Sequence, residues 1–198
     1  MGRGTLMIIG LTGYFAAGKS EASRIFKENN FFVIDVDKLG HQILENPEIK
    51  QKLLDYFGSE IVEDNKISRQ RLGSIVFQDK SKRQFLNSLV HPKIKEQIKI
   101  IIQQHSSQNI LIDAALLFEM NLHTLVDFVL FITADESILI KRGKQRNNFS
   151  EKKIKNILIA QKEFKDKEKL SHTVITNNTN LSDFQAKIKL FIQNQIQN

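Results

Sequence analysis

The stretch from Gly13 to Ser20 constrains the fold of this chain more than any other part of its sequence. It reads Gly-Tyr-Phe-Ala-Ala-Gly-Lys-Ser and matches the pattern G-x-x-x-x-G-K-[ST]. The apolar residues 6–11 before it predict a buried strand, and a helical pattern opens at Lys19. Glycines at both ends of the stretch let the backbone turn so that successive N–H groups point inward at phosphate oxygens. The sequence therefore predicts a strand, a phosphate-binding loop and a helix in succession; the alternative is an ordinary glycine turn.

Within this loop, different residues are expected to contact different parts of a nucleotide. The N-terminus of the following helix adds partial positive charge, Lys19 reaches the β- and γ-phosphates, and Ser20 can hold Mg²⁺. The predicted nucleotide-binding residues of the loop are Gly13, Tyr14, Phe15, Ala16, Ala17, Gly18, Lys19 and Ser20.

The composition is that of a globular protein. With 198 residues, 41% of them hydrophobic and 26% charged, the chain is long enough for one domain with a sizeable core. It has no run of about 18 apolar residues, and its first residues lack the apolar segment of a secretory signal. The absence of cysteine excludes disulfides, thiolate zinc sites and a cysteine nucleophile, and it fits a cytoplasmic location.

The net charge of +7 raises the question of a nucleic-acid partner. The lysines, however, are spread along predicted helices and mixed with acidic residues, as in residues 152–169, and the chain has two tyrosines and no tryptophan. This distribution favours a solvated basic surface, and phosphorylated ligands are enough to explain an electropositive cleft. We therefore expect neither a nucleic-acid partner nor membrane contact, and the oligomeric state stays open.

Strands and helices alternate along the chain, which predicts an α/β fold with a parallel sheet. The segment between the second and third strands is too long for one crossover helix, so we expect an inserted helical region near 55–105 within a single domain, 1–198. Pro47 and Pro92 both lie where a helix could start. The expected strands are 6–12, 31–35, 109–114, 127–132 and 173–176. The expected helices are 19–29, 37–45, 47–56, 68–78, 80–90, 92–105, 136–146, 150–164 and 181–195.

The carboxyl ends of the strands are where open α/β sheets bind ligands. Asp35 and Asp37 follow the second strand, and if the extended conformation persists, alternation places both on one side. One can then act as general base for an attacking hydroxyl while the other orients Mg²⁺ or its waters. The alternative is that Asp37 only caps the next helix.

Two further strand ends carry charged residues. The third strand closes with Asp113, as a Walker B strand does with its carboxylate near Mg²⁺, and Glu119 follows as a second acid or as a solvated helix residue. After the fourth strand, Arg142 and Arg146 share one face if the segment is helical, and both can clamp phosphates. On a lid at about 140–155 they would close over the nucleotide; the alternative is the basic end of a solvated helix.

Single residues in the inserted region give weaker signals. His91 precedes Pro92 and is interpreted as a helix-entry residue. Arg69 and Arg71 either meet an anionic acceptor or face water, and their spacing does not decide between the two.

In order and spacing, these motifs resemble those of the dephospho-coenzyme A kinase family over residues 7–178. The loop at Gly13 and the run Asp35-Val-Asp37 are similar to the family's phosphate loop and its Asp-x-Asp signature. The stretch from Asp113 to Glu119 resembles its Asp-x-Pro-Leu-Leu-Phe-Glu element. Other similar segments are Tyr56-Phe-Gly58, Ile67 to Phe77, Leu89-Val-His91-Pro92, Arg142 to Gln161 and Ile175-Thr-Asn177.

The chain also departs from the family pattern, although Lys19, Ser20 and Asp37 are unaffected. The departures are aromatic residues and alanines at 14–17 in a loop usually richer in glycine, His41 for an arginine, Ala115 for a proline and His172 for an aspartate.

The resemblance implies a three-layer P-loop kinase fold with a parallel five-stranded sheet, an inserted helical acceptor-binding region and a lid. It also implies that ATP, with Mg²⁺, phosphorylates the ribose 3′-hydroxyl of dephospho-coenzyme A in the last step of coenzyme A biosynthesis. The catalytic residues would be Asp37 as general base, with Lys19 and Arg142 stabilising the transferred group. Arg142 and Arg146 would join the nucleotide-binding residues. The substrate-binding residues would be Asp35, Asp37, Arg69, His91 and Leu116, and the metal-binding residues Ser20, Asp35 and Asp113.

Two alternatives stay open from the sequence alone. One is another small P-loop kinase that acts on a nucleoside, a nucleotide or a shikimate-like alcohol. The other is a nucleotide- or RNA-binding module without turnover.

Overall fold

A computed structural model describes residues 6–147, 149–162 and 166–196. The chain forms two compact units, one made of Met1–Asp35 and Ile102–Asn198, and one made of Val36–Ile101.

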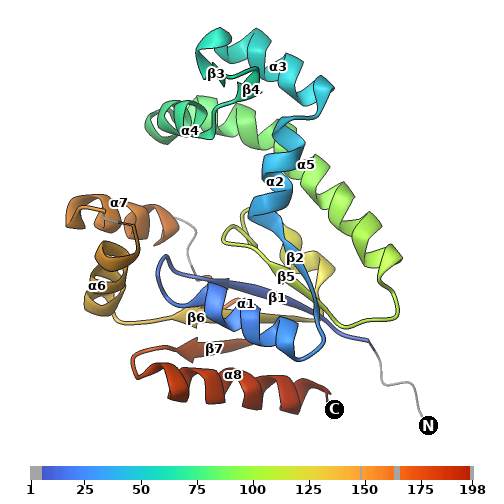
Figure 1. The fold of residues 1–198 in the computed structure, drawn as a ribbon, viewed down its shortest axis with the longest axis vertical. Helices are drawn as coiled ribbons and strands as arrows, with labels where there is room; N and C mark the ends of the chain where they lie inside the picture. The colour runs from blue at the N-terminus through green and yellow to red at the C-terminus, as the bar shows by residue number, and fades with distance from the viewer. Residues whose placement is uncertain (1–5, 148, 163–165, 197–198) are drawn as a thin grey trace. The chain divides into compact units, whose positions relative to one another are not determined.

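The first unit is built on a parallel five-stranded sheet (Figure 1). Its strands lie in the order β2 (Phe32–Asp35), β5 (Ile110–Asp113), β1 (Ile8–Gly13), β6 (Phe128–Thr133) and β7 (Thr173–Thr176). All five predicted strands are confirmed, and so is the α/β fold with a parallel sheet. Because the strands are parallel, their carboxyl ends share one edge, and the loop after β1 begins there.

Continuous apolar runs explain the central position of β1, β5 and β6. Ile9, Leu11, Leu111 and Leu130 are fully buried, as expected for strands covered on both faces. Helices α1 (Lys19–Glu28) and α8 (Leu181–Ile196) pack against each other beside the sheet. Their contact includes the rings of Phe26 and Phe191, whose centroids are 6.2 Å apart.

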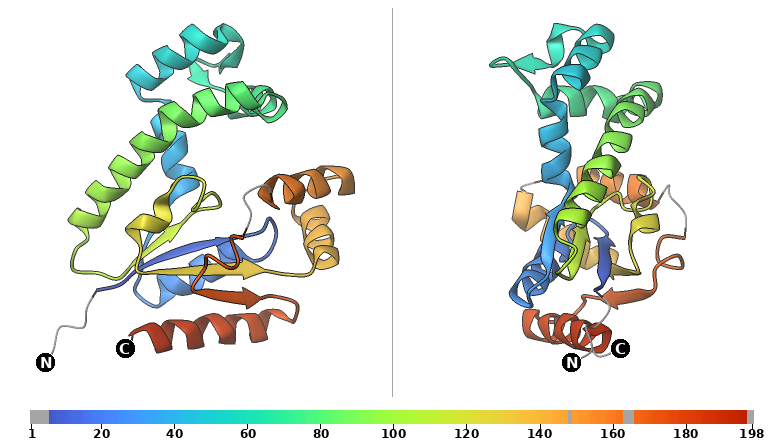
Figure 2. Two further views of the ribbon diagram at one scale, coloured as in Figure 1. Left: turned by 180° about the vertical axis from the view of Figure 1, so that it is seen from behind. Right: turned by 90° about the vertical axis from the view of Figure 1, so that its right-hand side faces the viewer.

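Two helices follow β6 in sequence, α6 (Glu136–Asn147) and α7 (Glu151–Lys162) (Figure 2). They approach closely because Gly143 has no side chain: a Cβ there would lie 2.9 Å from the Cδ1 of Ile154 and 2.9 Å from the Cε1 of Phe15. Most of the predicted helix 150–164 is confirmed, and its last two residues lie outside the described part of the chain. The predicted lid, about 140–155, includes the later part of α6 and the beginning of α7, and it stays a prediction.

The second unit is mainly helical. It contains α2 (Val36–Leu44), α3 (Pro47–Phe57), a 3₁₀ turn η1 (Ser59–Ile61), the hairpin β3 (Val62–Glu63) and β4 (Lys66–Ile67), α4 (Arg69–Gln78) and most of α5 (Lys80–Gln104). Pro47 starts α3, as predicted, and the Asn46 side chain accepts hydrogen bonds from the N–H groups of Glu48 and Ile49. The fold does not test whether this helical unit binds an acceptor, and that role stays a prediction.

The prediction of two helices meeting at Pro92 is wrong. α5 continues through Pro92, so His91 lies in the middle of a helix and not at its entry. A proline inside a helix forfeits one backbone hydrogen bond and clashes with the preceding turn. Val90, Ile94 and Ile98 are buried on either side of it, and their burial favours continuing the helix.

The hairpin β3–β4 was not predicted. Asp64 and Asn65 form its turn with φ angles of 49° and 60°, the backbone that a two-residue hairpin turn requires. No helix in the described residues is long and apolar enough to cross a membrane.

Candidate nucleotide-binding and catalytic site

The loop between β1 and α1 has three N–H groups already bonded within the protein. Tyr14 N–H donates to the Ile132 carbonyl at 3.1 Å. Phe15 N–H donates to Oε1 of Gln161 at 2.8 Å, and Ala17 N–H donates to the Tyr14 carbonyl at 3.1 Å. The loop amides that donate to no group among the described residues are those of Ala16, Gly18, Lys19 and Ser20. The predicted phosphate cradle therefore narrows to an arc of four amides at the start of α1.

Both loop glycines are required by geometry. At Gly13 a Cβ would collide with the carbonyl of Ile132. At Gly18, φ is 112°, and a Cβ would lie 2.5 Å from Nδ2 of Asn177. The backbone thus turns at Gly13 and Gly18 in a way that a residue with a side chain could not follow without strain or collision, as the sequence predicted.

The aromatic residues of the loop pack against the protein. Tyr14 meets Phe131 edge-on at 5.0 Å, and Phe15 stacks on Phe149 at 6.0 Å. Burial raises the pKa of the Tyr14 hydroxyl to about 12, and the charge of Glu168 and a hydrogen bond with its side chain add to that shift. Since their N–H groups are also occupied, Tyr14 and Phe15 shape the loop and offer no amide to a ligand.

Asn177, just after β7, connects the loop to α6. Its Nδ2 donates to the Ala17 carbonyl at 2.8 Å, and its N–H donates to the Thr133 carbonyl at 2.8 Å. Arg142 donates from Nη1 to the Asn177 carbonyl at 2.9 Å and from Nη2 to Oδ1 at 3.4 Å. Asn177 is only 6% exposed, and its hydrogen bond to the Ala17 carbonyl is buried, whereas its contacts with Arg142 are partly buried.

A pocket of about 480 Å³ joins the loop to the predicted lid arginines. Its lining residues are Ala16, Gly18, Ser20, Glu21, Arg142, Gln145 and Arg146. The structure thus brings Ala16, Gly18 and Ser20, whose N–H groups donate to no described group, together with both arginines that the sequence analysis had paired by their spacing. Glu21 and Gln145 were missed, because an acid and an amide on a helix carry no signal of their own.

Asp35 and Asp113 end neighbouring strands in register, Asp35 on β2 and Asp113 on β5. The Lys19 ammonium forms an ion pair with Asp113, whose side chain is 12% exposed. Burial raises the pKa of the Asp113 carboxyl, and the negative charge of Asp35 adds to this, whereas Lys19 and a hydrogen bond with Ser23 lower it. Lys19 is thereby held beside the strand that the sequence analysis compared with Walker B.

The predicted metal ligands supply oxygen atoms only, which is the donor set that Mg²⁺ prefers. Ser20 offers an exposed hydroxyl, and Asp35 and Asp113 offer carboxylates whose mutual repulsion a divalent cation would relieve. Among the described residues, no three or more His, Cys, Asp or Glu side chains form a ready-made metal cage. The residues therefore fit a Mg²⁺ ion that takes most of its ligands from water and phosphate.

The predicted pairing of Asp35 with Asp37 by strand alternation is wrong. The extended conformation stops at Asp35, because α2 begins at Val36. Asp37 lies inside the first turn of α2 with an exposed side chain, so it is not the residue that caps the helix either. The carboxylate in register with Asp35 is that of Asp113.

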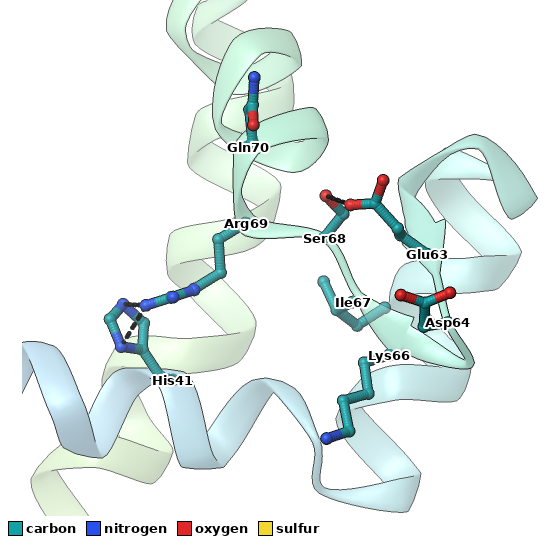
Figure 3. A pocket seen from close by; sticks show the side chains of 8 residues that line it. All are labelled: His41, Glu63, Asp64, Lys66, Ile67, Ser68, Arg69 and Gln70. Atoms are coloured by element: carbon teal, nitrogen blue, oxygen red, sulfur yellow. Dashed lines mark hydrogen bonds between the residues drawn. The ribbon is translucent and has the colours of Figure 1, made fainter.

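The second unit has a pocket of its own, about 730 Å³ in volume (Figure 3). Arg69, predicted to bind substrate, points at His41: its Nη1 lies 2.7 Å from Nδ1 and 3.0 Å from Nε2 of that ring. His41, which stands where the family pattern has an arginine, thus lies beside Arg69, a predicted acceptor-binding residue. The lining residues are His41, Glu63, Asp64, Lys66, Ile67, Ser68, Arg69 and Gln70.

The other predicted residues are placed as follows. Arg71 donates to the Val62 carbonyl at 2.7 Å and pairs with Glu63 at 3.2 Å, which accounts for its position without a ligand. Leu116 lies in the turn after β5 and is 41% exposed. Glu119 forms an ion pair with the buried Lys167, so it is not a solvated helix residue.

Comparison with known proteins points to the family that the sequence motifs resemble. A family model described as Dephospho-CoA kinase matches residues 7–183. The chain is 38% identical over 192 residues to a dephospho-CoA kinase of Oceanobacillus iheyensis, covering 94% of this chain and 96% of that protein. It is 32% identical to that of Fusobacterium nucleatum, covering 96% of this chain and 98% of that protein.

Solved structures of two kinds of kinase are similar to this chain. A dephospho-CoA kinase from Campylobacter jejuni has a TM-score of 0.71 at 26% identity, covering 96% of this chain and 97% of that one. A shikimate kinase from Acinetobacter baumannii has a TM-score of 0.52 at 16% identity, covering 96% of this chain and 95% of that one, and this similarity shows the fold alone.

Proposed function

Because the chain belongs to the dephospho-CoA kinase family, we propose that it transfers the γ-phosphoryl group of ATP to the ribose 3′-hydroxyl of dephospho-coenzyme A, giving coenzyme A and ADP. The observation that supports this best is the pocket that Gly18 and Ser20, whose N–H groups donate to no described group, line together with Arg142 and Arg146. Backbone amides at a helix N-terminus and guanidinium groups are the donors that hold a polyphosphate and stabilise the charge of its transferring end.

In this proposal the loop positions the donor nucleotide. The N–H groups of Ala16, Gly18, Lys19 and Ser20 donate hydrogen bonds to the phosphates, and Lys19 moves its ammonium from Asp113 to the β- and γ-phosphates. Arg142 and Arg146 stabilise negative charge on the transferring group. An arginine in this position contributes on the order of 10³–10⁵ in rate.

Mg²⁺ would supply neutralisation of charge between the β- and γ-phosphates. The Ser20 hydroxyl would hold it directly, and Asp35 and Asp113 would orient its waters. Asp35 and Asp113 lie in register, which supports assigning both carboxylates to the metal. Asp37 then remains as the general base.

Asp37 would accept the proton of the acceptor hydroxyl, a role worth about 10²–10⁴ in rate. Its exposed carboxylate, which caps no helix, is open to such a contact. The acceptor would also contact Asp35, Arg69, His91 and Leu116. This assignment rests on the motif match and on the exposure of Asp35, Arg69 and Leu116, whereas His91 is half-buried.

The experiment is an acceptor panel assayed by ADP release. The purified protein, with ATP and Mg²⁺, should phosphorylate dephospho-coenzyme A by a wide margin over nucleosides, nucleotides and shikimate, and mass spectrometry should place the new phosphate on the 3′-oxygen. Lys19→Ala should abolish release with every acceptor, whereas Lys27→Ala, on the same helix, should not. Preference for another alcohol would overturn the proposed acceptor. A cytoplasmic location and the absence of a nucleic-acid partner stay predictions from the sequence.

A further inference from the structure

The peptide group between Ala17 and Gly18 is held from one side only. Asn177 Nδ2 donates to its carbonyl oxygen at 2.8 Å, and no other described group donates to that oxygen. The peptide is trans, so its carbonyl and its N–H point in opposite directions. When Asn177 holds the carbonyl, it therefore aims the Gly18 N–H away from itself, and that N–H is one of the four loop donors left for phosphate.

Gly18 makes this control necessary. A glycine with φ of 112° rotates at little steric cost, so the peptide next to it can turn over unless something holds it. A Cβ at Gly18 would lie 2.5 Å from Nδ2 of Asn177, which shows how closely the amide is seated on the loop. No side chain at Gly18 restricts the rotation of this peptide group. Among the described residues, the hydrogen bond from Asn177 Nδ2 is the one that holds its carbonyl.

The same side chain also contacts Arg142. Oδ1 of Asn177 lies 3.4 Å from Nη2, and the Asn177 carbonyl lies 2.9 Å from Nη1. The guanidinium is thus held by its two terminal nitrogens, which leaves further N–H groups for the pocket that it lines together with Gly18 and Ser20. One buried residue consequently fixes two phosphate-binding groups on different elements.

We propose that Asn177 is a positioning residue for phosphoryl transfer, which sets the Gly18 amide and the Arg142 guanidinium in place together without touching the nucleotide. This inference rests on the proposed function. It adds to it a residue after β7, far from the loop in sequence, whose amide nitrogen and amide oxygen have separate tasks.

The two tasks can be separated by substitution. Asn177→Asp keeps oxygen acceptors for Arg142 but replaces the donor to Ala17 with an oxygen that repels the carbonyl. Asn177→Ala removes both side-chain contacts without adding charge. Neither change touches the backbone bonds of residue 177 to Thr133 and Arg142. The matched control is Asn178→Asp, since Asn178 is exposed and its Oδ1 accepts from the N–H of Asp135 at 2.9 Å, a bond that a carboxylate preserves.

The measurements are calorimetric titration with ADP and steady-state kinetics with ATP and dephospho-coenzyme A. We expect Asn177→Asp to weaken ADP binding and to raise the KM for ATP, each on the order of tenfold or more, with the KM for dephospho-coenzyme A unchanged. Asn178→Asp should match the parent protein in all three values. Should the acidic variant fail to fold, Asn177→Ala decides by the same titration.

Two outcomes would overturn the inference. One is a folded Asn177→Asp protein that melts at a lower temperature yet binds ADP as the parent does, because the residue would then be merely structural. The other is equal loss in the Asn177 and Asn178 variants. The ADP titration does not depend on the acceptor, so it tests Asn177 even if dephospho-coenzyme A proves not to be the substrate.

Discussion

Asp35 and Asp113 stand side by side at the ends of two neighbouring parallel strands, and the negative charge of Asp35 adds to the burial that raises the pKa of the Asp113 carboxyl. Lys19 lowers that pKa by its ion pair with Asp113. In the proposed reaction Lys19 turns to phosphate, and Mg²⁺ would then replace it as the positive charge near the Asp113 carboxylate. The position of the acids thus favours a kinase that works with Mg²⁺.

We predict that Asp113→Asn changes the magnesium dependence of the enzyme. Loss of a carboxylate that orients metal-bound water typically costs 10–100-fold in metal affinity. The Mg²⁺ concentration at half-maximal rate should rise by about that factor in a titration at saturating ATP. Asp183→Asn, in the first turn of α8, serves as control and should leave the titration unchanged. An identical Mg²⁺ titration for both variants would remove Asp113 from the metal site.

Asp37→Asn tests the general base. We expect kcat to fall about 10²–10⁴-fold while the KM for ATP stays near that of the parent, since the carboxylate is assigned to the acceptor proton and not to the nucleotide. Asp55→Asn provides the matched control, because Asp55 is likewise an exposed acid on a helix of the second unit. Near-normal turnover of the Asp37 variant would exclude it as the base.

Gly18→Ala should damage both stability and nucleotide binding. The new Cβ meets Asn177 Nδ2 at 2.5 Å and is strained at φ of 112°. Gly73→Ala, in open space on α4, should instead stabilise the protein by roughly 0.5–1 kcal/mol through helix propensity. Thermal melting with and without ADP measures both effects; a Gly18→Ala protein that ADP stabilises as it does the parent contradicts the proposed cradle.

Acid sensitivity should depend in part on Glu21. Hydrogen bonds with Arg24 and then Gln185 lower the pKa of this carboxyl to about 2 from its ordinary 4.5. Its contribution to the free energy of unfolding is therefore present above pH 4.5 and is lost as the pH falls toward 2. Glu21→Gln should flatten the decline of urea stability between those values, whereas Glu96→Gln, at an exposed pair on α5, should not. Parallel curves for Glu21→Gln and the parent would contradict this origin of acid sensitivity.

The features that were best predicted from the sequence are those set by residues close together in the chain. Buried parallel strands are short apolar runs, and the phosphate loop is a contiguous pattern, so both were found with their order. The strand ends at Asp35 and Asp113 were found for the same reason. Only the family resemblance grouped these two acids, as metal-binding residues; their strand register was not predicted, because the register of two strands distant in sequence is set by the whole sheet.

The errors and omissions have physical causes as well. At Pro92 local propensity argued for a break, but burial of the flanking residues carries the helix onward. Asn177 and Gln161 were noted only within similar segments, with no role, since a side-chain amide that bonds a loop 160 or 146 residues away leaves no periodic signal. The hairpin at Asp64-Asn65 could have been predicted from its turn residues.

The N–H groups of Ala16, Gly18, Lys19 and Ser20, which donate to no group in the described part of the chain, make the loop receptive to small oxyanions in general. Sulfate and inorganic phosphate are tetrahedral, doubly charged at most working pH values, and about the size of one phosphoryl group. We expect buffers and precipitants that contain them to compete with nucleotide phosphates for these N–H groups and so to mask weak nucleotide binding. Affinities for this protein are therefore best compared in chloride, which is not an oxyanion, at matched ionic strength.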